Sequence, residues 1–453
     1  MYYIGPIISV FFIVVTATLL LKRYNPQGVL LTAGLTMLVV SMVLNYELPK
    51  LLYPTAANGF NLFKYITESF SKTNAGVGLM IMSIGGYVAY IQNIGASKVL
   101  VDLAMRPLRL LKKYPYLASI LVIPLGQILF VAIPSAAGLG LLLMASLFPI
   151  LVKLGVSRLS AVSVITATTA FGIGPASAIT ASATEIANVD TVSFFVSKQI
   201  PIVIPLSISM MITYYFVNRY FDSKELDEVN LNIEESSELS APLIYAIIPV
   251  LPIILLLAFS SIFNFFSKPI ILDTTTAMFI SLFIALFFEL IRTKNFKNTM
   301  ESFKVFWNGM GSIFKSVVTL IITADIFAKG LISLGFIDGL LNLSQNLGFG
   351  IIGIGVVMTI MIFTASVMMG SGNASFFAFG PLVPKITSSY AVESTSLILP
   401  MQLSASMGRT VSPVSGVIIA TAEIAKVSPF SLVKRNFIPL LVALIMLIIL
   451  NNI

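Results

Sequence analysis

The stretches Gly174-Pro-Ala-Ser-Ala-Ile-Thr180 and Ser412-Pro-Val-Ser-Gly-Val-Ile418 decide the fold of this 453-residue chain. With the residues that follow, the ranges 174–201 and 412–439 agree at nine positions. The shared positions include Pro175/Pro413, Ser177/Ser415 and Glu185/Glu423. Each stretch places a helix-breaking proline inside an apolar segment. Interrupted hydrophobic segments at corresponding places in two halves are typical of secondary transporters, and the interruptions point to the substrate site.

The composition is that of an integral membrane protein. Hydrophobic residues make up 57% of the chain and charged residues 10%, with a mean hydropathy of +0.98, whereas soluble domains carry about 25% charged residues. The chain has neither cysteine nor histidine. Disulfides, thiol nucleophiles and the usual zinc sites are therefore excluded, and proton transfer is left to Asp, Glu, Lys or Tyr. The net charge of +8 comes from basic residues in short loops between apolar segments, which does not indicate a nucleic-acid partner.

Several segments are apolar and long enough to cross a bilayer, for which about 20 residues are needed. The predicted spans are 4–21, 28–45, 75–94, 191–216, 242–266, 272–291, 308–331 and 437–453. Two longer regions are interrupted by Gly, Pro, Ser and Asn, and each predicts a re-entrant hairpin followed by a broken helix. The hairpins are predicted at 114–155 and 347–386, and the broken helices at 158–190 and 393–426. Irregular backbone at membrane depth must be covered by protein or line a wet cavity.

The chain divides into two halves that share one plan, so we expect an all-α polytopic protein. The predicted regions are scaffold helices 1–113, a transport region 114–216, an acidic cytoplasmic linker 217–241, scaffold helices 242–346 and a second transport region 347–453. With the amino terminus outside, most basic residues fall on the inner side, as the positive-inside rule expects. The first hairpin then enters from the inside and the second from the outside. The two repeats are therefore predicted to be inverted.

Four short helices are predicted to begin near the middle of the membrane, two after the hairpin tips and two after the prolines. A helix start exposes unpaired N–H groups and carries roughly half a positive charge. Four starts around one cavity would bind an anion, and two pairs would suit a molecule with a carboxylate at each end. Each serine there either caps its own helix or contacts the ligand. The polar candidates are Ser135, Ser177, Ser371, Asn373, Ser375, Ser412 and Ser415, beside the breaks at Pro175 and Pro413.

Arg409 lies immediately before the second break. An arginine at the bilayer centre costs about 3 kcal/mol on insertion scales, so a partner must offset it. Its guanidinium matches a carboxylate with two parallel donors, which favours a direct substrate contact. The alternatives are a salt bridge to Glu423 or Asp325, or a side chain that reaches the membrane surface. The corresponding first-half residue is Phe171, so the halves are chemically unequal.

Three acids are candidates for coupling transport to a proton or a sodium ion. Glu185 and Glu423 occupy the same place in each repeat, ten residues past the proline, where an interfacial helix end is the alternative. Asp325 lies deeper in an apolar run, with Lys329 one turn further on. An ion pair within the helix is the alternative there.

Three long motifs carry a family resemblance. Gly370-Ser-Gly-Asn-Ala-Ser-Phe-Phe-Ala-Phe379, Gly408-Arg-Thr-Val-Ser-Pro-Val-Ser-Gly416 and Ala425-Lys-Val-Ser-Pro-Phe430 resemble the DcuC-type anaerobic C4-dicarboxylate carriers of bacteria, within the wider ion transporter superfamily. The likeness runs nearly end to end. It implies an inner-membrane carrier of fumarate, succinate, malate or aspartate that works by exchange, efflux or ion-coupled uptake. It also implies a dimeric scaffold with a transport domain that moves like an elevator.

The resemblance extends to individual site residues. The positions carried over are Ser371, Gly372, Asn373, Arg409, Thr410, Ser412, Ser415, Ser135, Gly138, Pro175 and Ser177. The superfamily often shows Ser-Asn-Thr at both hairpin tips, whereas here the tips read Ser135-Ala-Ala137 and Gly372-Asn-Ala374. That departure leaves the coupling ion and the carboxylate contacts open.

Other functions fit parts of the pattern. A carrier of another organic anion, such as citrate or an amino-acid derivative, or a cation antiporter could use the same fold. An intramembrane enzyme is disfavoured because there is no histidine for a zinc protease and Asp325 is the one convincing deep aspartate for an aspartyl protease. A Walker-type loop is absent from the sequence, which argues against a primary pump. We expect no cofactor and no metal site.

Overall fold

A computed structural model describes residues 4–111, 114–224, 241–260, 262, 270, 272–346, 348 and 350–452. Within these ranges all regular structure is helical, and nine helices are long and apolar enough to cross a membrane. They are α1 (Ile4–Leu21), α2 (Pro26–Val43), Asn58–Asn93, α6 (Pro115–Ala132), Thr191–Asp222, α14 (Thr274–Thr293), Phe296–Ser333, α18 (Ile351–Met369) and α23 (Pro429–Asn451). The protein is therefore a multi-pass membrane protein.

Three of these long helices contain a π-helical turn. Asn58–Asn93 consists of α3 (Asn58–Thr73), η1 (Asn74–Gly78) and α4 (Leu79–Asn93). Phe296–Ser333 consists of α15 (Phe296–Ile313), η5 (Phe314–Val318) and α16 (Thr319–Ser333). Thr191–Asp222 consists of α11 (Thr191–Phe194), η3 (Phe195–Gln199) and α12 (Ile200–Asp222).

Shorter helices fill the rest of the described chain. In the first half they are α5 (Ala96–Met105), η2 (Arg106–Leu111), α7 (Ala136–Ser146), α8 (Phe148–Lys153), α9 (Arg158–Ala167) and α10 (Ala178–Ala187). In the second half they are η4 (Leu243–Val250), α13 (Leu251–Ala258), α17 (Phe336–Asn346), α19 (Gly372–Phe379), η6 (Gly380–Leu382), α20 (Val383–Ser389), α21 (Thr395–Thr410) and α22 (Gly416–Ile424).

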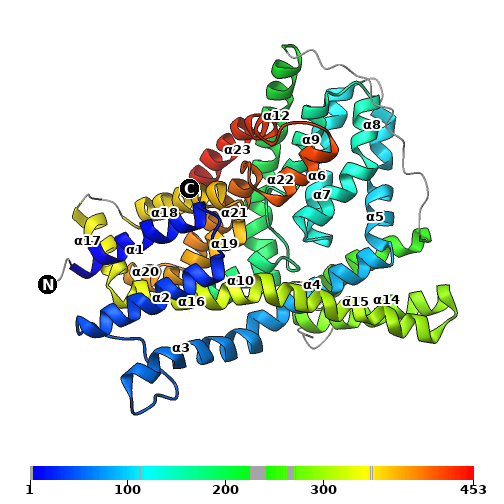
Figure 1. Ribbon diagram of the computed structural model, residues 1–453. Helices are drawn as coiled ribbons and strands as arrows, with labels where there is room; N and C mark the ends of the chain where they lie inside the picture. The colour runs from blue at the N-terminus through cyan, green and yellow to red at the C-terminus, as the bar shows by residue number, and fades with distance from the viewer. Residues whose placement is uncertain are drawn as a thin grey trace.

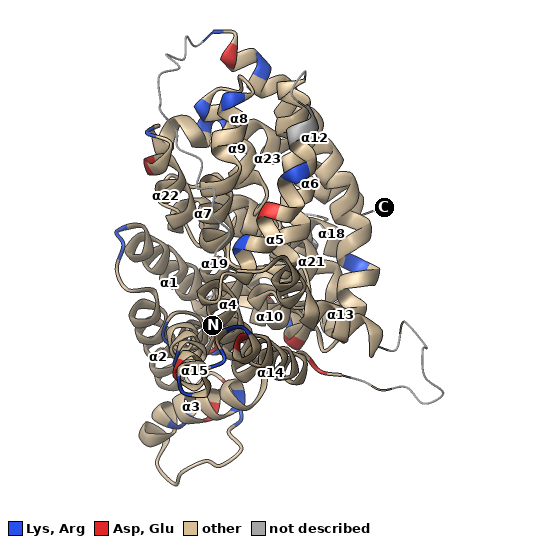
Figure 2. Cartoon of the chain, turned by 90° about the vertical axis from the view of Figure 1, so that its right-hand side faces the viewer, with Lys and Arg blue, Asp and Glu red and all other residues tan. Residues whose placement is uncertain are grey.

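The helices form two groups that lie on one another (Figure 1). In the lower part of the view α2 packs along α16, and α4 packs along α15 and α14. Above them lie α6 to α9, α12 and α21 to α23, where α12 packs on α23 and on α6. Figure 2 shows few charged residues on the helices and a mostly uncharged surface, which suits a protein that lies in lipid.

Glycines, which have no side chain, allow the closest contacts among the helices α2, α4, α15 and α16. A Cβ atom on Gly34 of α2 would lie 2.7 Å from the backbone of Ile326 in α16, and one on Gly309 of α15 would lie 2.9 Å from Gly86 Cα in α4. Membrane helices gain little from hydrophobic burial because lipid is equally apolar, so close packing of small residues supplies the attraction instead.

Two predicted spans are parts of longer helices. The predicted ranges 75–94 and 308–331 correspond to the carboxyl-terminal parts of the helices Asn58–Asn93 and Phe296–Ser333. The preceding turns carry charged side chains such as Lys64 and Glu68, so hydropathy does not reveal them. A helix of this length rises about 1.5 Å per residue and can run beyond the hydrocarbon layer.

Two predicted boundaries are corrected by the structure. Among the described residues of the predicted span 242–266, the helix runs from Leu243 to Ala258, and its first eight residues are 3₁₀-helical, since Pro249 and Pro252 remove backbone donors. Residues 261 and 263–266 lie outside the described residues. The predicted linker 217–241 begins too early, since α12 continues to Asp222, whose carboxylate is buried against other helices. The rest of the linker, residues 225–240, lies outside the described residues.

Candidate functional site

The first proline break lies against the end of α21, just before the second break. α9 ends at Ala167 and α10 begins at Ala178, while α21 ends at Thr410 and α22 begins at Gly416. The Arg409 guanidinium donates to the backbone oxygen of Thr169. A Cβ atom on Gly172 would lie 2.7 Å from Ser406 Oγ. The end of α21 is therefore in direct contact with the irregular segment that contains Pro175.

The hairpin tips adjoin the same region. A Cβ atom on Gly370 would lie 2.9 Å from the backbone of Val414, so the second tip touches the second break. A Cβ atom on Gly174 would lie 2.7 Å from Val131 Cγ1, so the end of α6 touches the first break. Across the halves, α7 packs on α22 and α10 packs on α19. The four short helices thus pack in two pairs, and each pair joins one helix of the first half to one of the second.

The serines at the four helix starts are of two kinds. Ser135 Oγ accepts from Gly138 N and Ser371 Oγ accepts from Ala374 N, each at 3.2 Å, so both cap their own helices. Ser177 and Ser415 occupy the same position of α10 and α22 but make no such bond. Their side chains are buried, and their hydroxyls bond to nothing in the described part of the chain. The break serines are therefore the ones available to a ligand.

Arg409 has no acidic partner among the described residues. Its Nε atom is buried without a hydrogen-bond partner, and the guanidinium carbon lies 6.0 Å from the centre of the Phe130 ring. The salt bridges considered from the sequence do not form, because Asp325 pairs with Lys329 and Glu423 is exposed. A buried donor without a partner is costly, so this guanidinium is suited to an anion that the protein does not supply.

The other predicted ligand contacts differ in whether their polar side-chain atoms already make hydrogen bonds within the protein. Thr410 Oγ1 donates to Ser406 O, and Ser412 Oγ accepts from Val414 N. Ser375 Oγ donates to Gly372 O, within α19. The half-buried Asn373 makes no side-chain hydrogen bond to the described residues, so its amide stays available. Gly138 and Gly372 contribute only backbone.

The three candidate coupling acids lie away from the breaks. Asp325 accepts from Lys329 Nζ and from Ser69 Oγ, both at 2.6 Å. Glu185 and Glu423 are both exposed. Asp325 and Glu185 line one cavity of about 250 Å³, together with Lys72, between α16, α10 and the end of α3. The structure does not bring Glu423 to that cavity.

Sequence reasoning missed a buried ion pair that joins the halves. Arg435 Nη1 lies 2.6 Å from Asp222 Oδ1, and the two side chains are only 2% and 7% exposed. The same carboxylate accepts from Tyr116 Oη, Ser157 Oγ and Ser160 Oγ. The pair ties α23 to α12 and α9. The signal was visible in Arg435, which lies inside an apolar helix rather than in a loop.

Buried amides at the breaks were missed as well. Asn436 Nδ2 donates to Thr410 O at 3.1 Å and to Thr166 Oγ1 at 3.0 Å. Gln199 Oε1 accepts from Gly174 N at 3.0 Å. The amide at each break comes from the long helix after the short one: Gln199 lies in Thr191–Asp222 and Asn436 in α23. Irregular backbone in a membrane protein needs such partners.

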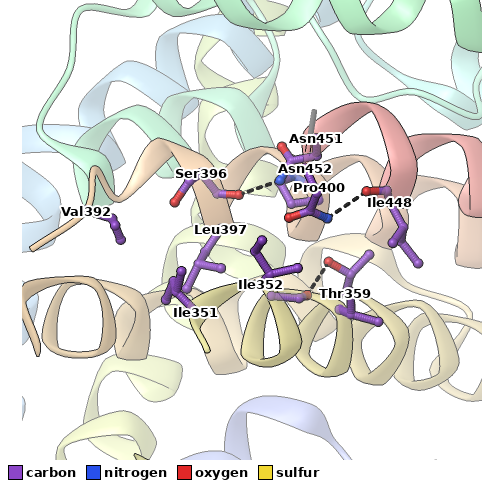
Figure 3. Close-up of a pocket in the computed structure, with 12 residues that line it drawn as sticks. Ile351, Ile352, Thr359, Val392, Ser396, Leu397, Pro400, Ile448, Asn451 and Asn452 are labelled. Carbon is purple, nitrogen blue, oxygen red and sulfur yellow. Dashed lines mark hydrogen bonds between the residues drawn. The ribbon is translucent and has the colours of Figure 1, made fainter. Parts of the chain in front are cut away.

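A cavity of about 280 Å³ lies elsewhere, between the starts of α18 and α21 and the end of α23 (Figure 3). Asn451 Nδ2 donates to Ser396 O and Asn452 Nδ2 donates to Ile448 O beside it. The lining contains no charged side chain and none of the predicted ligand contacts. An anion would find no charge partner there, so we place the candidate site at the breaks.

Comparison with known proteins now decides the family. Residues 4–452 match the C4-dicarboxylate anaerobic carrier family, DcuC. The chain belongs to the DcuC family. The anaerobic C4-dicarboxylate transporter DcuC of Escherichia coli K12 is 34% identical over 449 residues, which cover 99% of this chain and 96% of the relative. A probable DcuC of Vibrio cholerae is 36% identical over 437 residues, covering 95% and 93%.

These comparisons confirm the family resemblance seen in the motifs, and the DcuC relatives are transporters rather than enzymes. Two solved structures share the fold of this DcuC-family chain. The YdaH transporter of Alcanivorax borkumensis has a TM-score of 0.61 at 13% identity, covering 94% of this chain and 98% of that one. MtrF of Neisseria gonorrhoeae has a TM-score of 0.60 at 14% identity, covering 94% of each. At these identities the likeness concerns the fold alone.

Proposed function

We propose that this DcuC-family chain is a secondary active transporter of C4-dicarboxylates, such as fumarate, succinate, malate and aspartate, across the bacterial inner membrane. The relatives named for this activity align over nearly the whole chain. The observation that carries the proposal is Arg409, a half-buried guanidinium with no acidic partner among the described residues. A substrate carboxylate would supply that partner in two-point geometry.

Both ends of the substrate would be bound by the helix starts. One carboxylate would bind to Arg409 and to the helix starts of α22, at Ser415, and α19, at Asn373. The other meets the start of α10, where the Ser177 hydroxyl is free of a cap bond. Helix starts attract anions through their unpaired N–H groups and dipole. Two negative ends separated by two carbons suit this arrangement better than a monocarboxylate does.

Alternating access follows in this proposal from two inverted repeats and an elevator-like movement. Pairs of features separated by nearly the same interval support the repeats: the π turns η1 and η5, and the left-handed Gly95 and Gly335 that each end a helix. The group built from α2, α4 and α14 to α16 would form the scaffold of a homodimer. The group containing α6 to α10, α12 and α18 to α23 would move. The amino terminus would be periplasmic, as the basic loops favour.

Coupling would use exchange with an internal dicarboxylate, efflux, or uptake with a proton or sodium ion. Asp325 and Glu185 support an ion-coupled route, since they line one cavity between the two helix groups. Because Asp325 is already paired with Lys329, its carboxylate would have to exchange partners during the cycle. Uptake that persists when the sodium and proton gradients are collapsed would reduce the proposal to exchange alone.

Counterflow in proteoliposomes tests the function. Vesicles are loaded with unlabelled succinate and offered labelled fumarate, and citrate, aspartate and a monocarboxylate compete. We expect accumulation of label that C4-dicarboxylates suppress and the monocarboxylate does not. Preferential competition by citrate would assign another organic anion. No counterflow with any anion, but cation exchange, would replace the proposal with a cation antiporter.

A further inference from the structure

A closed network of buried amides joins the two halves at the first break. Gln402 Nε2, from α21, donates to Gly172 O at 2.6 Å and to Thr180 Oγ1 at 2.9 Å. Gln199 Nε2 donates to Thr180 Oγ1 at 3.1 Å and to Gln402 Oε1 at 3.2 Å. Gln199 Oε1 accepts from Gly174 N. The side chains of Gln199, Gln402 and Thr180 are each 0% exposed.

The network occupies every side-chain donor of Gln199, Gln402 and Thr180. The Thr180 hydroxyl accepts from both glutamines and donates to Gly172 O at 3.3 Å. Each glutamine NH₂ group makes two donor contacts, and each glutamine oxygen accepts one. Fully satisfied buried polar networks specify one arrangement, whereas a partly satisfied one is costly. The network therefore fixes the irregular backbone at Gly172 and Gly174 against α21.

The same helix carries Arg409, seven residues or about two turns beyond Gln402. The two side chains contact the first break at neighbouring points: Gln402 at the Gly172 oxygen and Arg409 at the Thr169 oxygen. Arg409 is thus positioned across the break by an anchor on its own helix. The start of α10 lies on the other side of the same segment, where Thr180 belongs to the first turn.

We propose that Gln402, with Gln199 and Thr180, is a positioning unit that sets the distance between Arg409 and the start of α10. Because those two features would bind opposite carboxylates, the network selects the four-carbon length of the substrate. This inference rests on the proposed function. None of the three side chains needs to touch the substrate, since each is already bonded within the network.

The first test compares two buried glutamines. Gln402→Met removes the donors to Gly172 and Thr180 at similar volume. Gln127→Met is the matched control, because Gln127 is 5% exposed and bonds only to Ser207, on α12. We expect Gln402→Met to raise the KM for succinate about tenfold with Vmax changed less, and to bring the KM of five-carbon glutarate closer to that of succinate. Gln127→Met should leave both KM values near wild type.

The second test uses the centre of the network. Thr180→Val removes the shared hydroxyl isosterically and should reproduce the change in KM and length preference, whereas Thr180→Ser keeps the hydroxyl and should restore both. This pair decides the matter if Gln402→Met does not fold. Thr421→Val is the control, since the Thr421 hydroxyl bonds only within α22.

The outcomes separate the inference from the function on which it rests. If folded Thr180→Val keeps the wild-type KM and the wild-type preference for succinate over glutarate, the positioning role is wrong while the transport function stands. An equal loss in Thr180→Val and Thr180→Ser would also overturn it. A wild-type protein that does not exchange succinate would overturn the proposed function, and length selection with it.

Discussion

The breaks at Pro175 and Pro413 share their sequence pattern but differ in charge and support. The first has a fully buried Phe171 where the second has Arg409. Two glutamines and a threonine hold the first break, whereas in the described part of the chain one amide, that of Asn436, bonds to the second. The comparison teaches that a repeated sequence pattern need not repeat its chemistry. The first break is neutral and bonded to buried amides, whereas the second carries a guanidinium, which is costly to place inside a membrane.

Removal of the charge should have the largest effect. We expect Arg409→Gln to lower kcat/KM for succinate about 1,000-fold, or about 4 kcal/mol, because a desolvated carboxylate would lose its charged partner. Arg409→Lys should not restore transport, since an ammonium lacks the planar two-point geometry. Counterflow rates measure the effect, and the exposed Lys297→Gln serves as the control. Normal affinity in Arg409→Gln would end the assignment of charge recognition to the second break.

The second-largest effect should be a loss of stability when the buried ion pair between the two halves is broken. Asp222→Asn removes the carboxylate charge that lies 2.6 Å from the buried Arg435 guanidinium, which should lower the free energy of unfolding by about 3 kcal/mol. The more exposed pair of Arg106 and Asp102, whose side chains are 45% and 27% exposed and 3.7 Å apart, provides the control, and Asp102→Asn should cost less than about 1 kcal/mol. Thermal unfolding of the purified proteins in detergent compares them. Equal shifts in melting temperature would show that the buried pair does not hold α12 to α23.

The break serines should affect binding more than stability. Ser177→Ala and Ser415→Ala each remove a hydroxyl without a cap bond, and the loss of a hydrogen bond to a charged ligand should raise KM about tenfold. We expect the melting temperature to stay near that of the wild type. If only one of the two variants raises KM, the breaks differ in ligand contact as well as in charge.

The hairpin serines should show the opposite and smallest pattern. Ser135→Ala and Ser371→Ala each remove an N-cap bond to Gly138 or Ala374, so each should cost about 1 kcal/mol of stability. KM should change little because the hydroxyl is already occupied. A rise in KM without a loss of stability would indicate that Ser135 and Ser371 contact the ligand. The hairpin serines and the break serines would then have the same role.

The local features of the site could be predicted from the sequence. A proline removes a backbone donor and a serine can cap the turn after it, so both act within a few residues. Ser135 and Ser371 cap α7 and α19, and α10 and α22 begin after Ser177 and Ser415, which make no cap bond. Hydropathy could not reveal the long amino-terminal extensions of Asn58–Asn93 and Phe296–Ser333, because these extensions carry charges. It also did not reveal that the span at 242–266 begins as a 3₁₀-helix and that its described helix ends at Ala258.

By itself, the sequence determined that this chain enters a membrane, that its helices are interrupted twice in matching places, and that it belongs with the DcuC carriers. Only the tertiary structure decided which serines are free and that Arg409 has no acidic partner among the described residues. The same holds for the contact of Gln402 with Gly172, 230 residues away in the chain. Composition and caps act over a few residues, whereas these pairings depend on how whole helices pack, which no local pattern records.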